Sequence, residues 1–179
     1  MDLDFDVVDL EKTDHPKEGD EAPDFTRPLV NEEFWEDVSL SELARERPVL
    51  LVFYPMDGDF PATYIWNEIR DRAWEESHEI EIIGCSISTP YEHKSLIEER
   101  HMNYRLFSDP QNEVAEKYDI VNDLDGMAGV SEARPAVFLL DSERTIESTC
   151  GSQSSGPTFP TTTPSGTLSR RSVPSGSSV

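Results

Sequence analysis

The chain has 179 residues, with 37 Asp and Glu against 15 Lys and Arg, and its formal net charge is −22 at pH 7. This length allows one domain with a hydrophobic core and gives no reason to expect two. Such an excess of negative charge repels nucleic-acid phosphates and anionic lipid, so we expect no nucleic-acid partner and no membrane surface as a partner.

The acidic residues are interleaved with apolar runs such as "PVLLVFY" and "PAVFLL", which can bury enough surface to fold. We therefore expect the carboxylates to coat a folded surface. With only four Lys in the chain, this acidic pattern predicts a salt-adapted, halophilic protein. The first ten residues contain no basic stretch, and no apolar run reaches membrane-spanning length, so the sequence predicts a cytoplasmic protein.

The first predicted element is a short exposed strand over residues 1–10, where acids alternate with apolar residues. A loop follows over residues 14–25. Residues 33–40 predict a strand that leads into a helix. Ser39, with Glu42 three residues later, has the capping-box pattern for the start of that helix.

The next predicted elements are a central strand and the helix after it. Residues 49–54 form a continuous apolar run, which is typical of a strand buried on both faces. Pro61 fits the first turn of the following helix and Asp59 fits its N-cap. Apolar residues recur at helical spacing along it, namely Ile65, Trp66, Ile69, Ala73 and Trp74.

Strands and helices alternate in the rest of the predicted domain. A buried strand over 79–87 precedes a helix over 89–102, and a short strand over 104–109 precedes a short helix over 110–120. Residues 133–147 predict two strands joined by a turn. This order indicates an α/β fold with mixed sheet directions.

The composition changes near residue 149. All 37 acids lie in residues 1–148, which carry 13 cations and therefore a charge of −24, whereas residues 149–179 hold two Arg and no acid. Ser, Thr, Gly and Pro dominate this last segment, so we expect a disordered tail. Three origins stay open for it: an interaction tail, a linker-like terminus or a frameshifted end.

Several segments resemble, in order and spacing, the peroxiredoxins, the alkyl hydroperoxide reductase and thiol-specific antioxidant family. They are "EGDEAPDF", "VSLSEL", "VLLVFYP", "EIIGCSIS", "LFSDPQNEVAEKYDI" and "ARPAVFLLD". The resemblance implies a thioredoxin-like α/β fold over residues 19–148, with a mixed central sheet flanked by helices. Residues 1–18 then form an acidic N-terminal segment, and 149–179 the tail. It also implies an antioxidant oxidoreductase without a cofactor, whose partners are a thiol donor protein or a second copy of the chain.

In that family the peroxidatic Cys lies in the first turn of the helix after the Tyr-Pro strand, in a Pro-x-x-x-Thr-x-x-Cys pattern. Counting from Pro55 places Asp59 at the Thr position and Ala62 at the Cys position. Alignment on Pro61 instead places Thr63 at the Cys position. Neither alignment brings a sulfur atom to the site.

The chemistry of the family explains why this replacement matters. Unpaired N–H groups at a helix start and a nearby guanidinium lower the pKa of a thiol from about 8.5, so that a thiolate attacks peroxide. The resemblance places Arg134 at the guanidinium position. Ala62 offers no nucleophile, Thr63 offers only a hydroxyl, and Asp59 adds a negative charge that opposes an anion. The sequence therefore predicts a degenerate catalytic site.

The cysteines and histidines are the other residues with chemical potential in this sequence. Cys85 lies inside an apolar strand, where Cys usually acts as a small hydrophobe, and a redox role is the alternative. Cys150 lies at the tail boundary, where a resolving role is an alternative. The two form no CxxC pair and predict no disulfide framework. His93 and His101 are two helical turns apart, so no metal site is predicted.

Three classes of function therefore stay open beside the family resemblance. The first is an enzyme that uses Cys85. The second is a binding module with a pocket near Asp59, Thr63 and Arg134. The third is an interaction protein that pairs through an edge strand or the turn face. We favour a peroxiredoxin-like protein without peroxidase activity.

Overall fold

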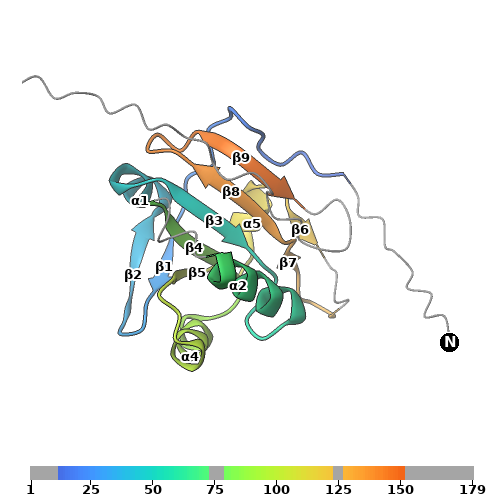
Figure 1. The fold of residues 1–179 in the computed structure, drawn as a ribbon. Coiled ribbons are helices and arrows are strands. Elements are labelled where there is room, and N and C mark those ends of the chain that lie inside the picture. Colours follow the sequence, from blue (N-terminus) through green and yellow to red (C-terminus); the bar gives the residue numbers. More distant parts are fainter. Residues whose placement is uncertain (1–11, 73–78, 123–126, 152–179) are drawn as a thin grey trace, which may run out of the picture.

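A computed structural model describes residues 12–72, 79–122 and 127–151. Figure 1 draws these residues as a coloured ribbon. Three sequence predictions lie outside the described residues: the strand over 1–10, the helical positions Ala73 and Trp74, and the state of residues 152–179.

The structure confirms an α/β fold with a mixed sheet and flanking helices. The elements in chain order are β1 (Thr26–Val30), β2 (Trp35–Ser39), α1 (Leu40–Glu46), β3 (Val49–Phe53), α2 (Phe60–Arg72), β4 (Glu81–Ser86), α4 (Pro90–Arg100), β5 (Arg105–Ser108), α5 (Glu113–Lys117), β6 (Val121–Asn122), β7 (Glu132–Ala133), β8 (Ala136–Leu140) and β9 (Ile146–Gly151). The main sheet has seven strands in the order β2-β1-β5-β4-β3-β8-β9, and β6 pairs with β7 in a separate two-stranded sheet.

The main sheet combines parallel and antiparallel pairs. β3, β4 and β5 run parallel to one another, whereas β8 and β9 continue the sheet antiparallel on one side. β1 and β2 form the antiparallel hairpin on the other side. The parallel strands therefore end at the same edge of the sheet, where the turn into α2 begins.

Helices cover both faces of this sheet (Figure 1). Residues of α1 and α5 share one hydrophobic cluster with Cys85, and residues of α2 and α4 belong to a second cluster. Leu51 of β3 lies in the first cluster and Val52 in the second. The prediction that this strand is buried on both faces is confirmed.

Two helices begin as their sequences require. At α1, the Ser39 side chain and the Glu42 side chain satisfy each other's backbone N–H groups, which confirms the predicted capping box. At α4, Thr89 and Glu92 form a second capping box ahead of Pro90. The second cap fixes where α4 starts, at the edge that also carries the start of α2.

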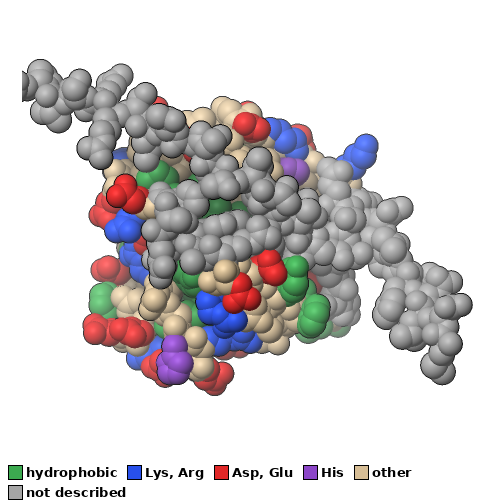
Figure 2. Space-filling view, in the orientation of Figure 1, with side chains coloured by type: hydrophobic (Ala, Val, Ile, Leu, Met, Phe, Trp, Pro, Cys, Tyr) green, Lys and Arg blue, Asp and Glu red, His purple; other side chains and the backbone are tan. Residues whose placement is uncertain are grey.

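Charged side chains of both signs lie on the described surface. Figure 2 shows Asp and Glu side chains spread over the face in view, with Lys and Arg side chains between them. None of the described helices is long and apolar enough to cross a membrane.

Candidate active site at the start of helix α2

The edge at which the parallel strands end collects the residues singled out from the sequence. The chain leaves β3 at Phe53, turns, and enters α2 at Phe60. On the neighbouring strand β8, Ala136 is paired with Phe53. Because β8 runs antiparallel to β3, Arg134 reaches this edge just before β8 begins.

Asp59 and Ala62 are held together at the first turn of α2. The Asp59 Oδ1 atom accepts a hydrogen bond from the Ala62 N–H at 2.6 Å, and the Asp59 carbonyl accepts one from the Thr63 N–H at 3.2 Å. Asp59 therefore caps the helix, as predicted. Its carboxylate occupies the position where the unpaired N–H groups of a helix start would stabilise another anion.

The side chains of Ala62 and Thr63 lie in different surroundings. The Ala62 side chain is 2% exposed and lies in the cluster formed by α2 and α4. The Thr63 hydroxyl accepts a hydrogen bond from Nη2 of Arg100, the last residue of α4, at 3.1 Å. A guanidinium therefore contacts the first turns of α2, but it comes from a residue that the sequence did not single out.

Arg134 is fixed through its backbone at the same edge. Its N–H donates to the Ile120 carbonyl at 2.8 Å, and its side chain is partly buried. The following residue, Pro135, is in the trans form, because the described residues contain no cis peptide bond.

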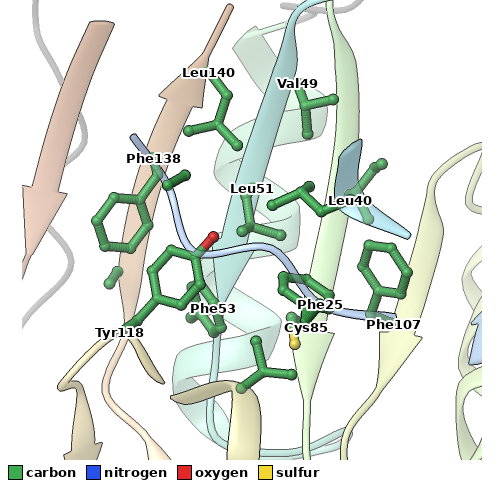
Figure 3. Packing of buried hydrophobic residues seen from close by; sticks show 14 of the residues in the cluster. Phe25, Leu40, Val49, Leu51, Phe53, Cys85, Phe107, Tyr118, Phe138 and Leu140 are labelled. Carbon is green, nitrogen blue, oxygen red and sulfur yellow. The ribbon is translucent and has the colours of Figure 1, made fainter. Parts of the chain in front are cut away.

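Cys85 lies on the other face of the sheet from Ala62. It is 1% exposed and packs in the first cluster, next to Phe25 and Phe107 (Figure 3). Burial raises the pKa of the Cys85 thiol well above its ordinary value, the negative charge of Asp109 raises it further, and Arg27 offsets part of this effect. A buried thiol that stays protonated has little reactivity.

Cys150 belongs to β9, where its backbone is paired with Val137 of β8. Only the backbone of this residue is described. A resolving or redox role of Cys150 therefore stays a prediction.

A series of hydrogen-bonded polar side chains beneath the β3–α2 turn was not predicted from the sequence. The Tyr54 hydroxyl donates to Asp57 Oδ1 at 2.8 Å, and Asp57 Oδ2 lies 2.8 Å from Nδ1 of His93. The sequence does contain one signal for a buried His93. His93, Leu96 and Ile97 have the spacing of one helix face, and all three are buried. Within the described residues, no group of three His, Cys, Asp or Glu could hold a metal ion.

The fold and this edge define the class of protein. A mixed sheet with three central parallel strands, helices on both faces and a helix that starts just after a Tyr-Pro strand is a thioredoxin-like fold of the peroxiredoxin type. The AhpC/TSA family model matches residues 18–149. The chain belongs to the AhpC/TSA family, the peroxiredoxins.

Named relatives agree with this assignment. The chloroplastic 2-cysteine peroxiredoxin of Chattonella marina var. antiqua is 30% identical over 138 residues, which cover 72% of this chain and 67% of that protein. The chloroplastic 2-Cys peroxiredoxin BAS1 of Spinacia oleracea is 26% identical over 149 residues, covering 79% and 54%. The chain thus spans between about half and two thirds of the length of these curated relatives.

Solved structures show the same fold. Peroxidoxin BcpB from Mycobacterium tuberculosis superposes with a TM-score of 0.67 at 26% identity, covering 78% of this chain and 88% of that chain. Reduced 2-Cys peroxiredoxin from Plasmodium vivax superposes with a TM-score of 0.65 at 22% identity, covering 76% and 72%.

Proposed function

We propose that this protein is a peroxiredoxin-family redoxin that has lost the thiol-dependent peroxidase reaction of its family. The observation that supports this most is the first turn of α2. There the two candidates for the family's Cys position are Ala62, which has only a buried methyl group, and Thr63, and the Ala62 N–H donates to the carboxylate of Asp59.

The chemistry of peroxide reduction explains why this arrangement should be inactive. In peroxide reduction a thiolate electron pair attacks one oxygen, the O–O bond breaks, and the sulfur becomes a sulfenic acid. Ala62 has no electron pair to give. The Thr63 hydroxyl is bound by Arg100, a cation that cannot take its proton.

Cys85 is the alternative source of a thiolate, and two observations disfavour it. It is buried on the opposite face of the sheet from α2, and its thiol pKa is raised well above the ordinary value, chiefly because burial disfavours the charged form. The helix start and its N–H groups are therefore not available to this sulfur.

The test is peroxide consumption by the full chain with a small thiol donor at high salt. We expect a rate equal to that of donor and buffer alone. Turnover by the unmodified protein overturns the proposal, and Cys85→Ser and Cys150→Ser variants then identify the sulfur responsible. An Asp59→Thr/Ala62→Cys protein serves as the matched control, because it restores a sulfur atom at the family position and removes the carboxylate beside it.

A binding or interaction role is the second candidate. Two aromatic side chains at the start of α2 and α4 are strongly exposed, Phe60 at 83% and Tyr91 at 72%. We propose that this turn face contacts a protein partner, either a second copy of the chain or a thiol donor protein. Sedimentation velocity over a range of concentrations tests the dimer: Phe60→Ser should shift the protein towards the monomer. A mass that is monomeric for both proteins contradicts it.

The proposed setting is a salt-rich cytoplasm. The charge of −22 with only four Lys supports this setting, because dissolved salt screens the repulsion between surface carboxylates.

A further inference from the structure

The strand β2 forms one edge of the main sheet, and its outer side has no strand partner among the described residues. β2 is the first strand in the sheet order and pairs with β1, whereas β9 lies at the opposite edge (Figure 1). The open side of an edge strand presents backbone N–H and C=O groups that can pair with another extended segment. The sheet can therefore gain a strand beside β2.

The pairing of β2 with β1 shows which of its backbone groups point outward. In an antiparallel pair, residues that exchange hydrogen bonds alternate with residues that do not. The Asn31 N–H donates to the Phe34 carbonyl at 3.0 Å, and the alternation starts from this pair. Trp35 and Asp37 fall on the positions that are not bonded to β1, and Asp37 lies opposite Pro28, which has no N–H to donate. The N–H and C=O groups of Trp35 and Asp37 thus face the open edge.

Two carboxylates lie on this edge, one on each face of the sheet. Glu36 and Asp37 are both exposed, and neither forms an ion pair with a described residue. Asp37 shares a face with Trp35, which packs edge-on against Tyr91 of α4 with 5.0 Å between the ring centroids. Glu36 shares the other face with Val38, which packs against the first hydrophobic cluster. A segment added beside β2 therefore meets a negative charge on each face.

These charges disfavour a second copy of the same edge. If two β2 strands paired across their open sides, the carboxylates of one strand would lie close to those of the other, and like charges on neighbouring strands are destabilising. A segment with two successive cations fits instead, because successive side chains of an extended segment also point to opposite faces.

The chain itself contains one such segment. Arg170 and Arg171 are its only two consecutive cationic residues, and they are the only charged side chains in residues 149–179. They lie in residues 165–173, "SGTLSRRSV", which contain no Pro, whereas a Pro stands directly before and directly after this segment. Every residue of the segment can therefore donate a backbone hydrogen bond, and the flanking Pro residues cannot.

We propose that residues 165–173 bind the open side of β2 in the same molecule as an added strand. The two guanidinium groups then lie one on each face of the sheet, beside Glu36 and Asp37. This contact does not involve the start of α2, so it stands apart from the proposed function. It selects the interaction tail among the three origins left open for the last segment.

The connecting chain is long enough for this contact. β9 ends at Gly151, at the opposite edge of the sheet. In a sheet of seven strands, a strand added beside β2 lies seven strand spacings from β9, or about 34 Å. Residues 152–169 are 18 residues and span up to about 59 Å when extended. Arg170 can therefore reach β2 with length to spare for a path around the helices.

Amide hydrogen exchange of the full-length protein, followed for each residue by nuclear magnetic resonance, tests this contact. The measurement uses the lowest salt concentration at which the protein stays folded, because salt screens the pairing of exposed charges. In the Arg170→Glu/Arg171→Glu protein, we expect the amides of Trp35 and Asp37 to exchange roughly tenfold faster than in the parent. Equal exchange of these two amides in the two proteins overturns the proposal.

The amides of Glu36 and Val38 serve as an internal control. They point towards β1, so they should exchange at the same rate in the parent and in the variant. Acceleration of these amides to the same extent as those of Trp35 and Asp37 also overturns the proposal, because it would report loss of the whole hairpin.

Charge reversal on both sides provides matched variants. Glu36→Arg/Asp37→Arg should accelerate exchange of the Trp35 amide as the tail variant does, and the combination of all four substitutions should restore slow exchange. Arg170→Lys/Arg171→Lys keeps the charge and should keep slow exchange. A combined variant that stays fast contradicts the proposal. So does slow exchange that depends on protein concentration, because the segment would then bind a second molecule.

Discussion

Asp59 sets the electrostatic character of the helix start at which a peroxiredoxin would hold its reactive thiolate. Its carboxylate accepts from the Ala62 N–H at 2.6 Å, so the positive end of the helix already faces a negative charge. In the proposed function, two changes separate this site from a working one: no sulfur lies in the first turn of α2, and the Asp59 carboxylate lies beside the proposed Cys position.

Restoring sulfur alone should therefore not restore a reactive thiol. In Ala62→Cys, we expect a thiol pKa no lower than the ordinary value of about 8.5, because Asp59 opposes a second negative charge. In Asp59→Thr/Ala62→Cys, which replaces the carboxylate by a neutral hydroxyl, we expect a pKa lower by about one unit. Thiolate absorbance as a function of pH, measured against the parent protein, gives both values. Equal pKa values in the two variants would contradict the role given to Asp59.

Cys85 gives a prediction for stability at alkaline pH. Burial raises the pKa of its thiol in the folded protein, whereas the unfolded chain ionises it at the ordinary value. Unfolding therefore releases a proton at high pH, and the free energy of unfolding should fall above that ordinary value by up to about 1.4 kcal/mol per pH unit. Below the ordinary pKa of a thiol, the contribution of the buried Cys85 to stability is fully present.

Chemical denaturation between pH 7 and 10 measures this effect. The matched control is Cys85→Ala, which should be less stable at pH 7 but should lose less stability as the pH rises. Parallel curves for the two proteins would show that Cys85 does not ionise on unfolding.

Contacts between elements explain how α2 comes to lie so close to the sheet. Trp66 of α2 packs over Gly84 of β4. A Cβ atom at residue 84 would lie 2.6 Å from Leu106 Cδ2 and 2.7 Å from Trp66 Cζ2. Since Leu106 and Trp66 are both buried, neither has room to move. The glycine thus allows the helix that carries the candidate site to approach β4 directly.

Gly84→Ala should therefore destabilise the protein by about 1 to 3 kcal/mol through overpacking. Denaturant unfolding measures the change. In a double-mutant cycle with Trp66→Phe, the smaller ring should relieve part of the clash, so the two substitutions should cost less together than the sum of their separate costs. Strict additivity would show that Trp66 is not the residue that limits the space at Gly84.

The elements that could be predicted from the sequence are those with strong local signals. The capping residues Ser39 and Thr89 precede their helices, and the apolar run of β3 is unambiguous. β1 was missed, because Arg27 and Pro28 interrupt its apolar pattern and only its pairing with β2 and β5 makes it a strand. Such pairing is a long-range interaction that no local pattern contains.

Some features of the candidate site could likewise be predicted from the sequence, and others could not. The cap formed by Asp59 follows from its position before Pro61, and the absence of sulfur from the first turn of α2 is plain in the sequence. The contacts of Thr63 with Arg100 and of Asp57 with His93 join residues that are 37 and 36 positions apart. They arise only when α4 packs beside α2 and the turn, so they could not be foreseen.

At the scale of the whole molecule, negative charge dominates. The net charge is −22, and carboxylates are spread over the surface in view in Figure 2. Their mutual repulsion opposes the compact state, and salt screens it over a distance of about 10 Å at 0.1 M.

We therefore expect the melting temperature to rise steadily with KCl concentration. Differential scanning calorimetry at several salt concentrations measures this rise. Repetition at a lower pH, where part of the carboxylates is protonated, should give a smaller rise, because less charge remains to be screened. A melting temperature that is independent of salt would contradict a stability limited by surface repulsion.

The most direct test of the proposal that the peroxidatic sulfur is missing is the intact mass of the full-length protein after brief exposure to a slight excess of hydrogen peroxide. We predict an unchanged mass, with Cys85 and Cys150 both recovered as free thiols. Rapid conversion of either residue to a sulfenic or sulfinic acid, or of both to a disulfide, would contradict the account, because it would show a reactive thiolate that the start of α2 does not supply.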